Sequence, residues 1–304
     1  MSLDRDLKQS RDYEMRTYLD SMKAMYDNAL AQNGEIYDIA RSSTQDFQNI
    51  TAAAVTADSR IIKILRYAIA PSISQMKFGQ LFGMGSIDAF ENDRLEVGSA
   101  KHAALCKIAD GIAAFASKNL DGERFLWVSN PEKTISDIGL ASEYAKGWTC
   151  SMAADQNAQT RYRTWRKDQQ EHAIASVLVG LGYTKSNYRG IVTKYTDIMI
   201  GEFTQELKVR GRTHQKADLI VRSKKTNKLV LIEAKAVGVE LDSTKRIKEC
   251  CDKANDWKSG RELDKPVVVA VIAGFFTPTG IKNLLASKIS VAWEHRLSDL
   301  SKVL

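Results

Sequence analysis

Three charged residues lie at the outer ends of two apolar segments that a short polar segment connects. Asp218 precedes the apolar run Leu219–Val221, and Glu233-Ala-Lys235 follows the apolar run 229–232. Charged groups in such surroundings are costly and usually serve a purpose. Two carboxylates and an ammonium could together bind a cation and assist the hydrolysis of a phosphate ester.

A hairpin predicts how these side chains lie. The segment Lys224–Asn227 between the two apolar runs has the composition of a turn. Asp218 and Glu233 are equally distant from its centre, so they should face each other on neighbouring strands, with Cβ atoms about 4.5–5.5 Å apart. Lys235 shares a face with Glu233 because side chains alternate along a strand. Like charges placed opposite each other need protonation or a cation to compensate them.

Mg²⁺ suits this arrangement chemically. It prefers hard oxygen ligands and takes the remaining ones from water and substrate phosphate. It would act as a Lewis acid and lower the pKa of a bound water, while the ammonium of Lys235 positions or deprotonates that water or neutralises charge in the transition state. The alternative interpretation is a buried salt-bridge cluster of Asp218, Glu233 and Lys235 with no catalytic role.

The pattern of Asp218, fourteen residues and then Glu233-Ala-Lys235 resembles the PD-(D/E)xK nuclease superfamily. The resemblance implies that Asp218 and Glu233 bind Mg²⁺, that the carbonyl of Ala234 completes the metal shell, and that Lys235 assists the nucleophilic water. The sequence departs from the family pattern at Ala217, where proline is usual. The resemblance extends over about residues 165–295.

In this superfamily a further carboxylate often comes from a preceding helix, and Glu171 is the candidate. The sequence predicts a helix over about 161–181, on which Glu171 shares a stripe with Ile174, Leu178 and Leu181. An acid on an apolar stripe is unusual. The alternative is that Glu171 lies at the edge of the stripe and pairs with a nearby Lys or Arg.

Two further segments give a finer resemblance. Residues 232–257 are similar to type II restriction endonucleases, in which a basic helix follows the catalytic strand. The segment Ala70–Lys77 resembles a Pro-x-Ile-Ser-Gln stretch of the XamI-like restriction enzymes, which makes Ser74, Gln75 and Lys77 candidate DNA contacts.

This resemblance implies a type II restriction enzyme, a sequence-specific endonuclease that cuts double-stranded DNA and leaves 5′-phosphate ends. It also implies a homodimer on a palindromic site and a companion DNA methyltransferase that protects the host. Two alternatives stay open: a repair or junction-resolving nuclease of the same fold, and a DNA-binding module whose site is vestigial.

The distribution of charge fits a polyanionic partner. Residues 1–150 contain 17 Lys and Arg against 20 Asp and Glu, whereas residues 151–304 contain 27 against 17. A basic half is expected of a DNA-binding protein, although solvated lysines with helical i,i+4 partners would give the same balance. The basic candidates for contact with DNA phosphates are Arg161, Arg163, Arg166, Lys167, Arg210, Arg212, His214, Lys216, Lys245 and Lys248.

The order of predicted elements indicates an α/β fold with a mixed sheet, a restriction-endonuclease-like core preceded by a helical region. Residues 1–155 have helical periodicity and are expected to serve DNA recognition or dimerisation. Residues 156–304 are expected to form the catalytic domain, with strands over about 202–209, 217–222, 228–237, 265–276 and 289–293.

Composition, cysteine spacing and the lengths of the apolar runs exclude several other classes of protein. With 44% hydrophobic and 27% charged residues, the chain is typical of a soluble globular protein. The four cysteines contain no C-x-x-C pair and suggest reduced thiols. No apolar run is long enough to cross a membrane, and the charged N-terminal segment lacks a signal core. We therefore expect a cytoplasmic protein, and the resemblance to restriction enzymes implies a bacterial or archaeal source.

Overall fold

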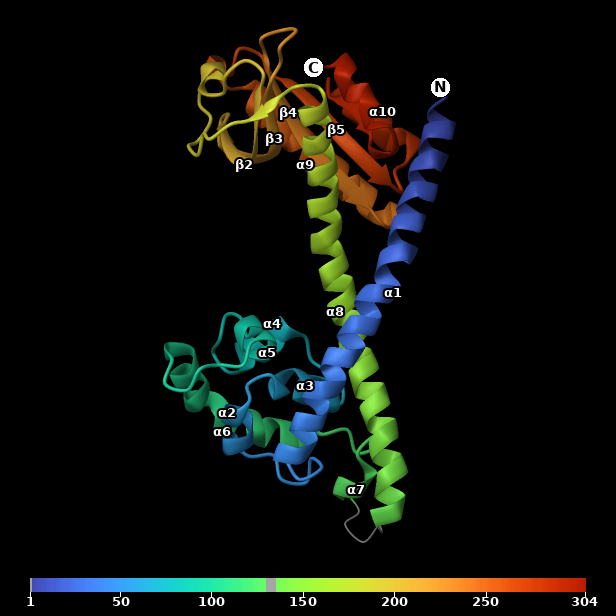
Figure 1. Cartoon of the computed structure of the whole chain (residues 1–304), viewed down its shortest axis with the longest axis vertical. Helices are drawn as coiled ribbons and strands as arrows, with labels where there is room; N and C mark the ends of the chain where they lie inside the picture. The colour runs from blue at the N-terminus through green and yellow to red at the C-terminus, as the bar shows by residue number, and fades with distance from the viewer. Residues whose placement is uncertain (1, 130–134) are drawn as a thin grey trace. The chain divides into compact units, whose positions relative to one another are not determined.

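A computed structural model describes residues 2–129 and 135–304. The chain forms two compact units, drawn in Figure 1. The helical unit is Met22–Arg161, and the sheet unit joins Met1–Ser21 to Tyr162–Leu304. The sequence predicted a boundary near residue 155 but gave no sign that the first residues belong with the sheet.

Two long helices, α1 (Leu3–Ser43) and α8 (Ile135–Gly180), contribute residues to both units. The helical unit also contains α2 (Ala52–Ala57), α3 (Ile61–Ala68), α4 (Gln75–Leu81), α5 (Asp88–Asn92), α6 (Ala100–Asn119) and α7 (Leu126–Ser129). Side chains of Thr51, Ser74 and Ser99 cap the first turns of α2, α4 and α6, which satisfies amide groups that a helix leaves unpaired at its start.

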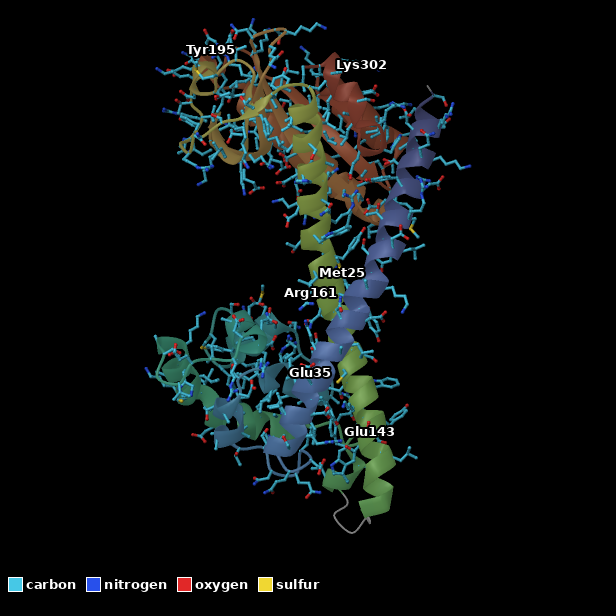
Figure 2. The ribbon with its side chains drawn as sticks, viewed as in Figure 1. Met25, Glu35, Glu143, Arg161, Tyr195 and Lys302 are labelled. Atoms are coloured by element: carbon cyan, nitrogen blue, oxygen red, sulfur yellow. The ribbon has the colours of Figure 1, made fainter. Side chains whose placement is uncertain are left out.

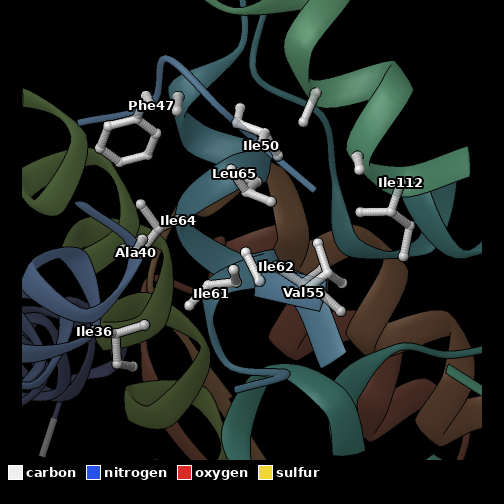
Figure 3. Close-up of a cluster of buried hydrophobic side chains, with 14 of the residues drawn as sticks. Ile36, Ala40, Phe47, Ile50, Val55, Ile61, Ile62, Ile64, Leu65 and Ile112 are labelled. Atoms are coloured by element: carbon white, nitrogen blue, oxygen red, sulfur yellow. The ribbon is translucent and has the colours of Figure 1, made fainter. Parts of the chain in front are cut away.

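Helix α3 forms the centre of the helical unit, because all eight of its residues are buried. Figure 3 shows Ile61, Ile62, Ile64 and Leu65 of this helix among side chains from α1, α2 and α6. Two of the buried α3 residues, Lys63 and Arg66, are charged.

The sheet unit is built on six strands in the order β1-β2-β3-β4-β5-β6. Pairs β2–β3 and β3–β4 are antiparallel, whereas β1–β2, β4–β5 and β5–β6 are parallel. This mixed sheet, together with the helical N-terminal region, confirms the predicted α/β fold class. The strands are β1 (Thr184–Lys185), β2 (Glu202–Arg210), β3 (His214–Arg222), β4 (Leu229–Val237), β5 (Val267–Gly274) and β6 (Ser290–Trp293).

A separate core covers each face of the sheet. Ile247 and Trp257 of α9 (Glu240–Lys258), with residues of α10 (Pro278–Ala286), pack on one face. Ile174 and Leu178 of α8 pack on the other face. Three short 3₁₀ helices complete the unit: η1 (Tyr195–Asp197), η2 (Arg261–Leu263) and η3 (Glu294–Lys302).

The first turns of α1 are anchored to the end of β5. The amide of Gly274 donates a hydrogen bond of 2.8 Å to Ser10 Oγ. Gly274 has a φ of 96°, and a Cβ there would come within 2.0 Å of the carbonyl oxygen of Val237. Only glycine fits this position, so Gly274 allows the backbone at the end of β5 to lie close to Val237 at the end of β4.

None of the helices within residues 2–129 and 135–304 is long and apolar enough to span a bilayer.

Burial should make the cysteines differ in reactivity. It raises the pKa of both the Cys150 and the Cys250 thiol to about 12, whereas Cys106 is exposed. Because the thiolate is the reactive form, a thiol reagent at neutral pH should modify Cys106 and spare Cys150 and Cys250. Peptide mass spectrometry of the native protein measures this, with urea-unfolded protein as the control. Equal labelling of Cys106 and Cys150 in the native protein would contradict the burial described.

Candidate active site

Three carboxylates occupy the same level of three neighbouring strands. In the β3–β4 register Leu219 pairs with Ile232, so one step further Asp218 lies opposite Glu233, as the hairpin predicted. In the β2–β3 register the pairs on either side of Asp218 are Leu207–Ala217 and Gln205–Leu219. Glu206 of β2 therefore lies beside Asp218 on its other flank.

The regular alternation of side chains breaks at this level. Residues two apart on a strand normally share a face, yet Ala217 packs in the core beneath α9 and Leu219 in the core beneath α8. Phe203 and Val209 of β2 are divided between the two cores as well, although their spacing predicts one face. Between them Glu206 has a φ of 60°, an uncommon conformation for a residue other than glycine. Such backbone strain is concentrated at functional sites.

Glu171 of α8 joins the carboxylates of Asp218 and Glu206. One oxygen from each of the three lies within 4.8 Å of the others. Glu171 and Asp218 are 6% and 7% exposed, whereas Glu206 is only partly buried, so two of the three carboxylates are shielded from solvent. The amide of Ala234 donates a 2.8 Å hydrogen bond to Asp218 Oδ2, which fixes the orientation of that carboxylate.

Glu233 is fully buried and holds two ammonium groups. Lys235 Nζ and Lys253 Nζ each donate a 2.6 Å hydrogen bond to Glu233 Oε1. The other oxygen, Oε2, is buried and has no hydrogen-bond partner among the residues that the structure describes. An unpartnered buried oxygen of a charged group is costly, and it indicates a place for a positive ligand.

Two more lysines pair with the carboxylates that come from β2 and α8. Lys167 Nζ lies 2.8 Å from Glu206 Oε1 and 3.3 Å from Glu171 Oε1. Lys216 pairs with the second oxygen of Glu206. The site thus brings together four carboxylates (Glu171, Glu206, Asp218, Glu233) and four ammonium groups (Lys167, Lys216, Lys235, Lys253).

Burial and charge shift the pKa values of the site in a consistent way. Burial raises the pKa of Glu233, and the charge of Asp218 raises it further against the opposing effect of the two lysines. Burial and Asp218 likewise raise the pKa of Glu171. For Lys235, burial acts to lower the pKa, but the charge of Glu233 and its hydrogen bond outweigh burial and raise it. Lys235 is therefore held as a cation, which suits stabilisation of negative charge.

The donor set fits a divalent cation. It consists of hard carboxylate oxygens, which Mg²⁺ and Ca²⁺ prefer, and one of them is the unpartnered Oε2 of Glu233. The resemblance gave Asp218, Glu233 and the carbonyl of Ala234 as the metal ligands. The structure gathers Asp218 with Glu171 and Glu206, and lysines occupy one oxygen of Glu233.

Glu206 and Lys253 are the site residues that sequence reasoning missed. Glu206 could have been found by applying the hairpin arithmetic once more. Glu206 and Asp218 are each six residues from Arg212, in the turn between β2 and β3. In the sequence Lys253 is one of several basic residues on a predicted helix, and nothing local shows that its side chain turns toward the sheet.

Comparison with known families supports a nuclease. The family model described as XamI restriction endonuclease matches residues 45–293. The chain belongs to this family. It is therefore a restriction endonuclease, a hydrolase whose substrate is DNA. Among curated protein sequences none matches the chain.

The family match includes both segments that gave the finer resemblance, Ala70–Lys77 and 232–257. In the first of these, Gln75 is already engaged with the carboxylates of Asp88 and Glu91, and Ser74 caps α4 through the amide of Lys77. Ser74 and Gln75 thus have structural roles in the endonuclease, while the side chain of Lys77 is exposed.

Most basic candidates for DNA contact are on the surface of the endonuclease. Side chains of each unit are drawn in Figure 2, where Arg161 is labelled on α8. Lys167 and Lys216 are exposed in part but pair with Glu206 at the acidic site. The remaining exposed candidates are Arg161, Arg163, Arg210, Arg212, His214, Lys245 and Lys248.

Arg166 is a correction to the predicted DNA contacts. It is 4% exposed, and its guanidinium donates to Glu14 and Glu294 at 2.7–3.0 Å. Tyr162 and Tyr13 donate hydrogen bonds to the same two carboxylates. Arg166 therefore joins α1, α8 and η3 inside the sheet unit and is not available to a DNA phosphate.

Replacement of Arg166 should reduce stability. Arg166→Met leaves the buried carboxylates of Glu14 and Glu294 without their cation, and removal of one partner from a buried ion pair costs about 3–5 kcal/mol. Urea unfolding measures the loss, with Arg163→Met on the same helix as the matched control for an exposed arginine. If the two variants unfold at the same urea concentration, the buried network does not exist as described.

Proposed function

We propose that this endonuclease is a type II restriction enzyme that cuts both strands of double-stranded DNA at a specific sequence, with Mg²⁺, and leaves 5′-phosphate ends. One observation carries the proposal. Glu171, Glu206 and Asp218 form a close cluster of carboxylates; on the neighbouring strand Glu233 has one buried oxygen without a partner among the described residues, and Lys235 donates to its other oxygen. Family membership supports the DNA substrate.

Asp218 and Glu233, with the carbonyl of Ala234, would hold the metal ion, and Glu171 and Glu206 would contribute further oxygens. When bound, Mg²⁺ supplies Lewis acidity to the phosphate and lowers the pKa of a water. The protein's own groups orient these ligands, since the amide of Ala234 fixes Asp218 and the two ammonium groups fix Glu233 Oε1.

The charge balance of the site favours binding of substrate together with the cation. Four carboxylates and four ammonium groups cancel each other formally. A divalent cation would make the site positive, and a positive site attracts the phosphate backbone. Lys235, held protonated by Glu233, would then stabilise the negative charge that grows on the phosphate during attack.

We propose that the exposed basic residues position the DNA backbone. Arg210, Arg212 and His214 flank the turn that leads into β3 and Asp218, while Lys245 and Lys248 lie on α9. Arg163 and Lys167 in the second half of α8 and Lys216 near the start of β3 would add contacts. Arg161 and Lys77 would contribute from the helical unit. Contacts to phosphate fix register but read no sequence, so base recognition is assigned to the helical N-terminal region.

Cleavage of both strands of a palindromic site is most simply achieved by a two-fold dimer, and we propose a homodimer. A type II enzyme also requires a companion DNA methyltransferase that protects the host sites. Such an enzyme would meet incoming DNA in the cytoplasm of a bacterium or archaeon.

Digestion of unmethylated phage DNA tests the function. With Mg²⁺ the endonuclease should produce discrete fragments whose ends can be mapped and, because they carry 5′-phosphates, ligated. EDTA should abolish cleavage because the carboxylates act through a cation. Cleavage that persists in EDTA would contradict the metal assignment. Nicking confined to branched DNA would favour a repair or junction-resolving enzyme, and DNA binding without cleavage a module with a vestigial site.

Asp218→Ala and Glu233→Ala should each lower the cleavage rate by about 10³-fold, the scale seen when a group that stabilises transition-state charge is removed. DNA binding in Ca²⁺, followed by gel shift, should survive in both variants. Asp242→Ala, an exposed acid in the first turn of α9, is the matched control and should cleave normally. Full activity of either site variant would refute the assignment.

A further inference from the structure

Lys253 has an unusual place for a residue on a basic helix. It belongs to α9, yet its side chain is only 23% exposed and its Nζ reaches two acceptors inside the site. One acceptor is Glu233 Oε1 at 2.6 Å, and the other is the carbonyl oxygen of Lys216 at 2.9 Å. The Nζ also lies 5.9 Å from the centre of the Trp257 ring. These contacts turn the ammonium away from solvent and toward the carboxylates.

The two acceptors lie on different strands. Glu233 is on β4, and Lys216 is on β3, two residues before Asp218. Lys253 thus joins the two strands beside the Asp218–Glu233 pair. The carboxylates of Asp218 and Glu233 are like charges on neighbouring strands and repel each other, so a cation that bridges the two strands holds them together.

Lys253 shares with Lys235 the task of neutralising Glu233. Both ammonium groups donate to the same oxygen, Glu233 Oε1. Without Lys253, Lys235 would be the only cation among the described residues that pairs with the fully buried carboxylate of Glu233. A lysine that alone neutralises a buried acid is held there strongly. With Lys253 present, the acid keeps a cation even when Lys235 turns toward the phosphate.

We propose that Lys253 is a positioning residue of the nuclease site: it neutralises Glu233 from α9 and ties β3 to β4, which leaves Lys235 available to the scissile phosphate. This inference rests on the proposed function, since it assigns a role within the same site. It acts through Glu233 and Lys235 rather than by contact with DNA. Loss of Lys253 should therefore slow the cleavage step and leave DNA affinity unchanged.

The test measures the initial cleavage rate on phage DNA at saturating concentration, which gives kcat, and the DNA concentration at half-maximal rate, which gives KM. In K253M we expect kcat to fall about 10- to 100-fold, as is usual when a partner of a metal-ligating side chain is removed, with KM unchanged. K253R, which keeps a cation, should retain more of kcat than K253M or K253Q. Lys282→Met, an exposed lysine of α10, is the matched control and should behave as wild type.

Each result decides the matter. An unchanged kcat in K253M, or a raised KM at constant kcat, would overturn the inference, the second by showing that Lys253 contacts DNA. Equal losses in K253R and K253M would also overturn it, because the loss would then not depend on charge. Thermal unfolding is recorded for every variant, and if K253M fails to fold, the comparison of K253Q with K253R decides in its place. If the wild-type chain cuts no DNA, or if Asp218→Ala cuts as well as wild type, the proposed function itself fails.

Discussion

The repulsion between buried carboxylates is the constraint on which the sheet unit depends. Asp218 lies between Glu206 on β2 and Glu233 on β4, with Glu171 approaching from α8. Acids packed so closely oppose the folded state unless cations compensate them. Lysines do so from both sides. At the same level Glu206 adopts a positive φ, and β2 and β3 both change faces. The strained residue is thus itself a member of the carboxylate cluster.

Some of this site could be predicted from the sequence because its geometry is local. The turn at Lys224–Asn227 fixes which residues of β3 and β4 face each other, so the pairing of Asp218 with Glu233 follows from counting. Glu171 could be singled out because it interrupts an apolar stripe on a regular helix. Glu206 was open to the same counting across the preceding hairpin. The fold class followed from the alternation of apolar strands and helices.

The rest could not be predicted because the partners lie far apart in the chain. Arg166 reads as one arginine of a basic helix, but its partners are Glu14 and Glu294, 152 and 128 positions away. Lys253 likewise lies among exposed basic residues, and only the packing of α9 on the sheet shows that it faces Glu233. Periodicity describes which face of a helix is apolar, whereas the partner of a long charged side chain depends on tertiary structure.

The anchoring of α1 at Gly274 and Arg166 has a consequence for synthesis on the ribosome. The family match begins at residue 45, yet Met1–Ser21 belongs to the sheet unit and holds Arg166 together with Glu294 near the other end of the chain. The charges of Glu14 and Arg166 are therefore fully paired only after residue 294 has been synthesised. The carboxylates and lysines of the candidate site, which lie within residues 167–253, are therefore synthesised before this network can be completed.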